Sequence, residues 1–585
     1  MKQFLKYTLA TVVGVFLSFL FLGFLMFFTV LSLTSSKSKE TLEVKNNSVI
    51  ELNIDYDVAE RTEDDFMQIF NPEGGSHQLG LDQILKLIES AKKDKNIKGI
   101  FLKTNLNNSG YATLQEIRNA LKDFKSAGKF VYAYAPYFDE KNYYLSSIAD
   151  SIFIEKSGNV LLNGLSANMV FYKDALSKIG VEMQYVKVGA YKGAIEAYTR
   201  SELSPENKEQ IQRYVNNIYR NLLSSISENR KIDTSRLHSL FDNFDIKSPA
   251  NAVQFGLIDK LTHVNSILKN LKNKLGVKKE DELELVKADK YFNTLKDEDK
   301  SKDKIALIYA IGDIVDGKGG DGSIGSLSMS KAIAKAREDK KIKAIVLRIN
   351  SPGGSALASD IIMQEILLCK GVKPVIVSMG DVAASGGYYI SAMADSIIAM
   401  PNTITGSIGV FGLFPNMQGL LKDKIGLNFE SVKTGKYADF GRVDRPLSET
   451  DRFYLQSMVN RIYEDFTNVV EQGRKLDSVS VEKISQGKVW TSSDAIAYKL
   501  VDSYGGINDA IKIAAYKAKL KEYSVVELPK KEDPFSKLFN DKSNAMFDSK
   551  LKSELGVFYT YFNAFQSAVN NQGFQMRIPY YLNIQ

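Results

Sequence analysis

Residues 388–396 read YYISAMADS, and residues 143–151 read YYLSSIADS. A second match pairs DKNIKGI at residues 94–100 with DKKIKAI at residues 339–345, and both pairs are separated by 245 residues (388 − 143 and 339 − 94). Patterns that recur in the same order at one long spacing indicate a duplicated unit. The sequence therefore predicts two copies of one domain.

Within each copy, short apolar stretches alternate with longer amphipathic ones, which indicates strands separated by helices. In the first copy we expect strands at residues 49–54, 97–102, 130–135 and 151–155 and helices at residues 114–127 and 142–148. In the second copy we expect the matching strands at residues 305–309, 344–349 and 374–378. Strands joined by crossover helices form parallel sheets, so the sequence predicts an α/β fold in each copy.

The length of the chain agrees with a duplication. It has 585 residues, more than one hydrophobic core usually serves, so two domains of roughly 250 residues and some additional segments are expected. We predict an N-terminal transmembrane anchor at residues 1–36, a first repeat at 45–295, a charged linker at 296–304, a second repeat at 305–520 and a C-terminal extension at 521–585.

Composition argues against several classes of protein. The net charge of +7 is spread along the chain rather than gathered in a basic arm, so no nucleic-acid partner is expected. Cys369 is the single cysteine, so no disulfide can form within the chain. The three histidines, His77, His238 and His263, do not have the spacing of zinc ligands. We therefore expect neither a metal nor a cofactor.

The N-terminus is the clearest topological signal. Residues 7–36 contain no charged side chain, and residues 9–33 are almost entirely apolar, which is long enough to cross a bilayer core of roughly 30 Å. A cleaved signal peptide has a shorter apolar core of about 7–15 residues, so we interpret this segment as a membrane anchor. The stretch SLTS at residues 32–35 leaves cleavage open as an alternative.

The orientation of the anchor follows from its flanking charges only weakly. Lys2 and Lys6 precede the apolar segment, whereas Lys37 and Lys39 follow it. We expect the N-terminus to stay in the cytoplasm, which places the rest of the chain outside it.

The candidate chemistry is divided between the copies. The second copy has Ser385 within GDVAASGGYY at residues 380–389, and the first has Lys192 within GAYKG at residues 189–193. At the local offsets of the repeat, Ser385 falls opposite Glu140 and Lys192 falls opposite Ala438. Each copy has therefore lost the group that the other retains, and we expect neither half to be active alone.

Ser385 has two interpretations. A serine before a helix is often an N-cap, whose hydroxyl accepts from free backbone N–H groups. Here, however, Gly386 and Gly387 after the serine allow another chain to approach closely, and a second motif, NSPGGS at residues 350–355, follows an expected strand and is placed to aim backbone N–H groups at a developing oxyanion. The first copy has NLNNSG at residues 105–110 instead, without the Pro-Gly-Gly turn. The glycine turn is present only in the copy that has the serine. This favours the interpretation of Ser385 as a nucleophile.

Lys192 would need an unusual environment to take part. A free lysine, with a pKa near 10.4, is protonated at neutral pH and cannot accept a proton from a serine unless burial or a neighbouring positive charge lowers that pKa. Serine–lysine pairs are a known variant of the catalytic triad, with an amine in place of the imidazole.

Taken together, these motifs resemble those of the long, two-repeat signal peptide peptidases, membrane-anchored bacterial serine proteases of peptidase family S49. The resemblance covers nearly the whole chain. It rests on residues 350–355, 380–388, TGSIG at 405–409, GKVWT at 487–491 and GAYK at 189–192.

The resemblance implies a ClpP/crotonase-like α/β fold in each repeat and a homotetramer with its sites inside a bowl. It also implies that Ser385 is the nucleophile and Lys192 the general base. Gly354, supported by Gly353, would donate its N–H to the oxyanion, and Ser407 would orient the lysine.

The activity implied by the resemblance is endopeptidase cleavage of signal peptides and other extended apolar peptides, by an enzyme of the inner membrane whose catalytic part faces the periplasm. Two alternatives remain open from the residues. The same fold serves acyl-CoA enzymes, and a catalytically inactive membrane scaffold would keep the fold without the chemistry.

Overall fold

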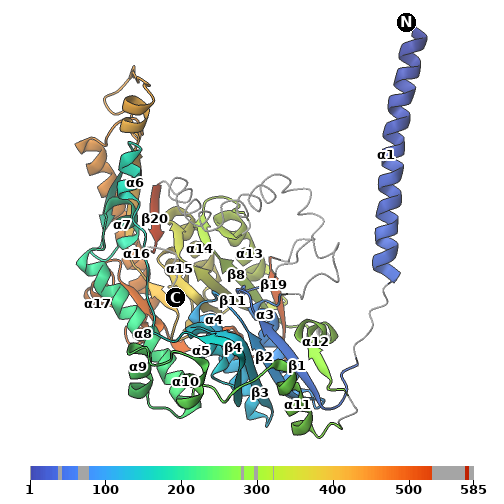
Figure 1. The fold of residues 1–585 in the computed structure, drawn as a ribbon. Helices are drawn as coiled ribbons and strands as arrows, with labels where there is room; N and C mark the ends of the chain where they lie inside the picture. The colour runs from blue at the N-terminus through green and yellow to red at the C-terminus, as the bar shows by residue number, and fades with distance from the viewer. Residues whose placement is uncertain are drawn as a thin grey trace.

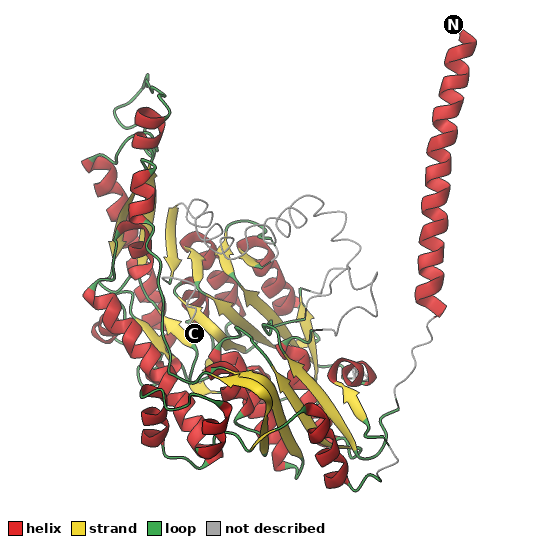
Figure 2. Ribbon diagram, viewed as in Figure 1, coloured by secondary structure: helices red, strands yellow, loops and turns green. Residues whose placement is uncertain are grey.

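The computed structural model describes residues 2–36, 43–62, 78–278, 282–295, 301–320, 322–529 and 573–578. Most of the predicted linker and much of the predicted C-terminal extension lie outside these residues. The strands run through the middle of the body, and helices lie around them (Figure 2).

The first half forms a six-stranded parallel sheet in the order β6-β4-β3-β2-β1-β7 (Figure 1). Its strands are β1 (Ser48–Ile54), β2 (Ile97–Thr104), β3 (Phe130–Phe138), β4 (Ser151–Val160), β6 (Lys260–Leu261) and β7 (Leu285–Lys287). Its helices include α3 (Leu81–Lys93), α4 (Tyr111–Ser126), α5 (Glu140–Ser146) and α8 (Pro205–Arg230). Strands β1 and β2 are mostly buried, whereas β3 alternates buried and half-buried residues, so the second face of the sheet is less completely covered there.

The second half repeats this arrangement in a larger sheet, in the order β17-β15-β13-β11-β8-β19, with β14 paired to β13 and β18 paired to β14. The strands are β8 (Lys304–Ile311), β11 (Ile342–Ser351), β13 (Val375–Ala384), β14 (Ser396–Ala399), β15 (Ile404–Gly406), β17 (Val489–Thr491), β18 (Ser503–Tyr504) and β19 (Ser524–Leu528). Its helices include α13 (Ser326–Glu338), α14 (Ala356–Cys369), α15 (Gly386–Ser391), α16 (Glu449–Arg474) and α19 (Ile507–Lys517).

The two sheets have the same strand order at their centres. Strands β2, β3 and β4 begin at residues 97, 130 and 151, and β11, β13 and β14 begin 245 residues later, at 342, 375 and 396. The prediction of a duplicated α/β unit is therefore confirmed. The expected helix at 114–127 begins earlier, at Tyr111, because Asp381 of the second half accepts from the N–H groups of Ala112 and Thr113, each at 2.9 Å.

A third sheet joins the halves. Its order is β10-β9-β12-β20-β16-β5, with β5 (Glu182–Val188) from the first half and the other strands from the second half and the C-terminal segment. These are β9 (Asp313–Val315), β10 (Ser323–Gly325), β12 (Gly353–Ser355), β16 (Val410–Asn416) and β20 (Gly573–Arg577). Strand β5 pairs antiparallel with β16 from Val188↔Val410 to Glu182↔Asn416. Repeat spacing alone does not predict this pairing.

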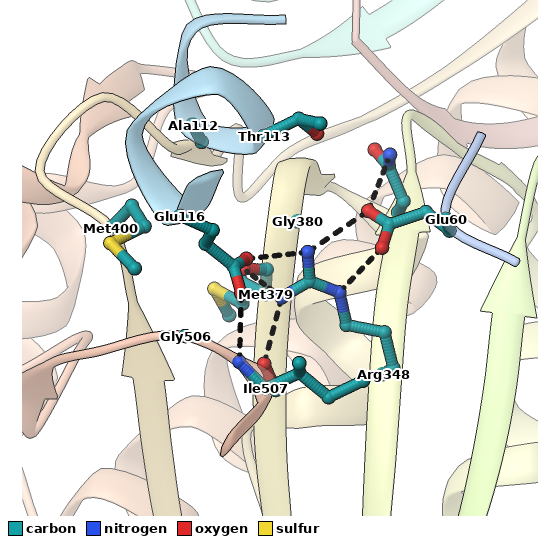
Figure 3. A network of polar contacts seen from close by, with 12 residues as sticks. Glu60, Ala112, Thr113, Glu116, Arg348, Met379, Gly380, Met400, Gly506 and Ile507 are labelled. Atoms are coloured by element: carbon teal, nitrogen blue, oxygen red, sulfur yellow. Dashed lines mark hydrogen bonds and ion pairs between the residues drawn. The ribbon is translucent and has the colours of Figure 1, made fainter. Parts of the chain in front are cut away.

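Buried contacts also join the halves. One hydrophobic core cluster contains residues of both, including Ile50 and Leu102 from the first and Val346 from the second. Next to it, the fully buried guanidinium of Arg348 lies 2.8 Å from a carboxylate oxygen of Glu60 and 2.6 Å from one of Glu116, both in the first half (Figure 3). The two repeats therefore pack as one body.

The N-terminal helix α1 (Lys2–Ser36) stands apart from this body (Figure 1). Its stretch Lys6–Leu25 has a mean hydropathy of 2.3 and none of it is buried. Twenty helical residues span about 30 Å, the thickness of a bilayer core. By length and composition, α1 is a candidate membrane span.

Candidate active site

Ser385 lies at the junction between β13 and α15, after the last strand residue, Ala384. Its backbone has φ +55° and ψ −115°, an unfavourable conformation for a residue with a side chain. The Ser385 N–H donates to the Gly406 carbonyl at 2.8 Å, which helps to hold this turn. The hydroxyl makes no capping hydrogen bond with α15, so the N-cap interpretation is wrong.

Lys192 comes from the first half, where the chain leaves β5 and turns at Gly189 with φ +109°. Its side chain is fully buried, and its Nζ lies 2.7 Å from Oγ of Ser385. The same nitrogen lies 2.9 Å from the carbonyl oxygen and 3.0 Å from the hydroxyl of Ser407. Two residues that are 193 apart in the sequence thus meet at hydrogen-bonding distance.

Burial lowers the pKa of Lys192 well below its ordinary value of 10.5, because the charged ammonium loses its hydration. No carboxylate of the described residues forms an ion pair with this amine that would offset the loss. The oxygens around it belong to a neutral carbonyl and two hydroxyls. This environment favours the neutral amine, which can accept a proton from a neighbouring hydroxyl.

Ser407 follows β15, which ends at Gly406. Its φ of +52° is unusual, and its N–H donates to the Lys488 carbonyl at 2.7 Å. This conformation lets both its carbonyl and its hydroxyl reach the amine of Lys192. The sequence singled out Ser407 by resemblance alone, since nothing in its spacing indicates such a backbone.

Gly353 and Gly354 are the first two residues of β12 and adopt φ values of +105° and +155°. A Cβ at Gly354 would lie 2.0 Å from the Ile314 carbonyl, so only glycine fits there. A Cβ at Gly353 would lie 2.8 Å from the backbone nitrogen of Gly386, the residue after the serine. The glycine turn and the serine turn therefore pack directly against each other.

Sequence reasoning missed two contributions. It gave Gly386 no role as a hydrogen-bond donor, although in serine hydrolases the N–H of the residue after the serine is a common oxyanion donor. It quoted GKVWT at residues 487–491 without a role, yet Gly487 lies against the lysine: a Cβ there would be 2.6 Å from the Lys192 backbone nitrogen. The Tyr191 N–H donates to the neighbouring Gln486 carbonyl at 3.0 Å.

The residues that correspond to Ser385 and Lys192 in the opposite repeats, Glu140 and Ala438, do not form a second serine–lysine pair. Glu140, opposite the serine, is buried, and its carboxylate accepts from the N–H groups of Asn163 and Gly164 at 2.7 and 2.9 Å. Burial raises the pKa of Glu140 to about 7. Ala438, opposite the lysine, is exposed to solvent.

Neither of the two histidines within the described residues, His238 and His263, takes part in this arrangement. His238 contacts Tyr219, and His263 forms an ion pair with Glu155, while His77 lies outside the described residues. Within the described ranges, no three His, Cys, Asp or Glu side chains form a group that could hold a metal ion.

Comparison with known proteins assigns the chain to a family. Peptidase family S49 matches the chain twice, at residues 123–278 and 368–521. The first match contains Lys192 and the second contains Ser385. Protease 4 of Haemophilus influenzae is 35% identical over 84% of this chain and 83% of its own length. The chain belongs to peptidase family S49.

The chain is also similar to proteins from other organisms. The chloroplastic serine protease SPPA of Arabidopsis thaliana is 34% identical over 77% of this chain and 68% of its own length. A putative signal peptide peptidase SppA of Enterococcus faecium is 36% identical over 33% of this chain and 57% of its own length. Among solved structures, a point mutant of ClpP1 from Listeria monocytogenes aligns at 16% identity over 35% of this chain and 94% of its own, with a TM-score of 0.25. The S49 membership makes this chain a peptidase rather than an acyl-CoA enzyme.

Proposed function

We propose that this S49 peptidase is an endopeptidase with a serine–lysine dyad, in which Ser385 is the nucleophile and Lys192 the general base. The observation that carries the proposal is the contact of 2.7 Å between the Ser385 hydroxyl and the fully buried Lys192 amine. An amine whose pKa is lowered by burial has the protonation state that a general base needs near neutral pH.

In the proposed acylation step, neutral Lys192 takes the hydroxyl proton of Ser385 while Oγ attacks the substrate carbonyl carbon. The ammonium that forms is stabilised by the carbonyl and hydroxyl of Ser407, which lie 2.9 and 3.0 Å from Nζ. The carbon–nitrogen bond of the tetrahedral intermediate then breaks, and Lys192 gives its proton to the leaving amine. Water, deprotonated by the same lysine, releases the acyl group from Ser385.

The backbone N–H of Gly354 would donate to the oxyanion, with Gly353 shaping the turn, and we add the Gly386 N–H as a second donor. The close packing of Gly353 on the Gly386 nitrogen supports this pairing. Fixed donors aimed at developing charge are usually the largest electrostatic contribution to such reactions, and losing one costs about 10²–10³ in rate.

The proposed substrates are extended apolar peptides, above all signal peptides left in the membrane after cleavage. The apolar helix α1 supports a single-pass anchor in the inner membrane, with its lipid contacts made by Lys6–Leu25 and the catalytic part outside the cytoplasm. We also propose a homotetramer, which rests on the resemblance to the long signal peptide peptidases. Catalysis as proposed requires no metal or cofactor.

Hydrolysis of an apolar peptide ester tests the dyad. We expect Ser385→Ala and Lys192→Ala each to lower kcat by about 10⁴-fold, the usual effect of removing a member of such a unit. The matched controls are Ser391→Ala, which removes another buried hydroxyl near the site, and Lys173→Met, which removes an exposed lysine. Both controls should retain wild-type rates. Undiminished hydrolysis by Lys192→Ala near neutral pH would show that the dyad assignment is wrong.

A further inference from the structure

The pairing of β11 with β13 is interrupted just before the candidate nucleophile. It shifts register between Ile349 and Ser351, where three residues of β13, 380–382, lie opposite one residue of β11, Asn350. We call these three residues the β13 bulge. A bulge bends its strand and redirects the side chains that follow, and bulges are common beside active sites. The β13 bulge ends three residues before Ser385.

The side chain of Asn350 bridges the β13 bulge. Its Oδ1 accepts a hydrogen bond of 3.1 Å from the backbone N–H of Val382. Asn350 is also the first residue of the NSPGGS turn, in which Gly354 carries a proposed oxyanion donor. One side-chain amide therefore connects the strand that leads to Ser385 with the glycine turn that packs against the serine turn.

Glu60, from the first half, holds this amide in place. Asn350 donates from Nδ2 to Oε1 of Glu60 at 2.9 Å. Arg348 donates to the same carboxylate from Nε at 2.8 Å and from Nη2 at 3.1 Å (Figure 3). Because all three contacts are donated to Glu60, both of its oxygens act as acceptors, as in an ionised carboxylate. A Cβ at Gly380 would lie 2.2 Å from Oε1, so the carboxylate also packs directly on the β13 bulge.

The backbone around Glu60 is fixed on both sides. The carbonyl of Ala59 accepts a hydrogen bond of 2.8 Å from the Leu81 N–H. Arg61 forms an ion pair of 3.4 Å with Glu527 on β19. Glu60 itself is only 6% exposed. The first half therefore inserts a firmly held carboxylate beneath the glycine turn of the second half.

The equivalent positions of the first repeat are arranged differently. The residue 245 positions before Asn350 is Asn105, which is exposed to solvent. The residue 245 positions before Arg348 is Lys103, whose amine lies 3.0 Å from a carboxylate oxygen of Glu51. The pairing of β2 with β3 is in regular register. The bridged bulge therefore accompanies the serine, which favours a role in the chemistry over a general requirement of the fold.

We propose that Glu60 and Asn350 are positioning residues for the reaction of Ser385. The Glu60 carboxylate holds the Asn350 amide across the β13 bulge, and this fixes the oxyanion-donating turn relative to the nucleophile. The inference rests on the proposed function, since it assumes that Ser385 reacts beside the Gly354 turn. It gives the first repeat a second contribution to the site besides Lys192, one that acts through the backbone.

Hydrolysis of an apolar peptide ester by full-length variants tests this role, with rates expressed per site labelled by a fluorophosphonate. In Glu60→Gln, one amide oxygen replaces two acceptors. We expect kcat to fall about 10–100-fold and KM to stay within about twofold, because misplaced reacting groups slow the chemical step without changing ground-state binding. The matched control is Glu116→Gln, at a buried carboxylate whose partners are Arg348, at 2.6 Å, and the Ile507 N–H instead of Asn350. Its kcat should stay within about threefold of wild type, and equal losses in the two variants would overturn the proposal.

An exchange of donor and acceptor separates positioning from a general effect on folding. In Glu60→Gln/Asn350→Asp, the new amide can donate to the new carboxylate, whose other oxygen can still accept from the Val382 N–H. We expect this double variant to recover at least about tenfold in kcat over Glu60→Gln, since such coupling is characteristic of residues in direct contact. A double variant no faster than Glu60→Gln would refute the proposed contact.

Asn350→Leu tests the same contact if Glu60→Gln does not fold, because it leaves the ion pair of Glu60 with Arg348 intact. We expect a comparable fall in kcat at unchanged KM, and a wild-type kcat would show that the amide does not position the turn. Failure of the proposed function would be distinct. In that case Ser385→Ala would hydrolyse the ester at the wild-type rate, whatever the Glu60 and Asn350 variants do.

Discussion

Burial of Lys192, the proposed general base, affects the stability of the protein as well as the proposed activity. Its amine is fully buried, and burial lowers its pKa well below 10.5. At pH values between this lowered pKa and 10.5, the amine is protonated in the unfolded chain and neutral in the folded chain. Because the unfolded state binds more protons in this window, stability rises with pH there.

We therefore expect the melting temperature of wild type to rise relative to that of Lys192→Met as pH increases from about 8 to about 10. At neutral pH the methionine variant should be the more stable protein, since it removes the cost of burying a basic amine. Thermal unfolding of both proteins over a pH series measures the difference. Parallel pH dependences would mean that the amine keeps its ordinary pKa in the folded chain.

Several residues of the site were predictable, and their conformations were not. The repeat and its motifs singled out Ser385 and Lys192, and the structure brings them into contact. The left-handed backbone of Ser385 and Ser407 has no sequence signal, because both positions carry a side chain where glycine would be expected. Packing of the surrounding turns determines these conformations, and packing depends on contacts that one sequence does not reveal.

At the scale of elements, the halves determine each other's boundaries. Asp381, on β13 beside the serine turn, accepts from the N–H groups of Ala112 and Thr113 and from the Thr113 hydroxyl at 2.6 Å. A carboxylate at a helix N-terminus satisfies free N–H groups and interacts favourably with the helix dipole. Here one repeat supplies the cap for a helix, α4, of the other.

Asp381→Ala should therefore destabilise the protein by about 1–2 kcal/mol, since the loss of a helix cap typically costs about 1 kcal/mol and this carboxylate makes three hydrogen bonds. Thermal unfolding beside the exposed-site control Asp423→Ala measures the effect. An effect no larger than that of the control would mean that the cap contributes nothing to the packing of the repeats.

The central strands were predictable because alternating apolar stretches carry a strong signal, and β2, β11 and β13 lie where the sequence places strands. The third sheet was not. Its pairings of β5 with β16 and of β12 with β20 join residues more than 200 positions apart, such as Val188 with Val410 and Gly354 with Met576, and no local pattern specifies such partners. The C-terminal extension was expected to carry no chemistry, whereas β20 within it borders the site.

At the scale of the whole molecule, the site exists only because the repeats pack together. Strand β5 leads to Lys192 and pairs with β16 of the second repeat, so both members of the proposed dyad come from one chain. In any assembly of copies, each site should therefore be complete within its own chain. Mixing two inactive variants can test whether each site is complete within one chain.

Mixing purified Lys192→Ala and Ser385→Ala proteins, with or without co-refolding, should restore no hydrolysis of an apolar peptide ester. Each chain lacks one member of its own dyad, and a partner chain does not supply it. The positive control is wild type diluted into either variant, which should retain activity in proportion to its amount. Recovery of activity in the mixed variants would show that the serine and lysine meet between chains.

The central claim is that a buried, neutral lysine of the first repeat activates a serine of the second. The most direct measurement is the rate at which a fluorophosphonate labels Ser385 as a function of pH, in wild type and in Lys192→Ala. We predict that the wild-type rate rises with pH through an apparent pKa well below 10.5 and that the variant is labelled at least about 100-fold more slowly, with no such rise. Equal labelling of the two proteins across the pH range would contradict the account.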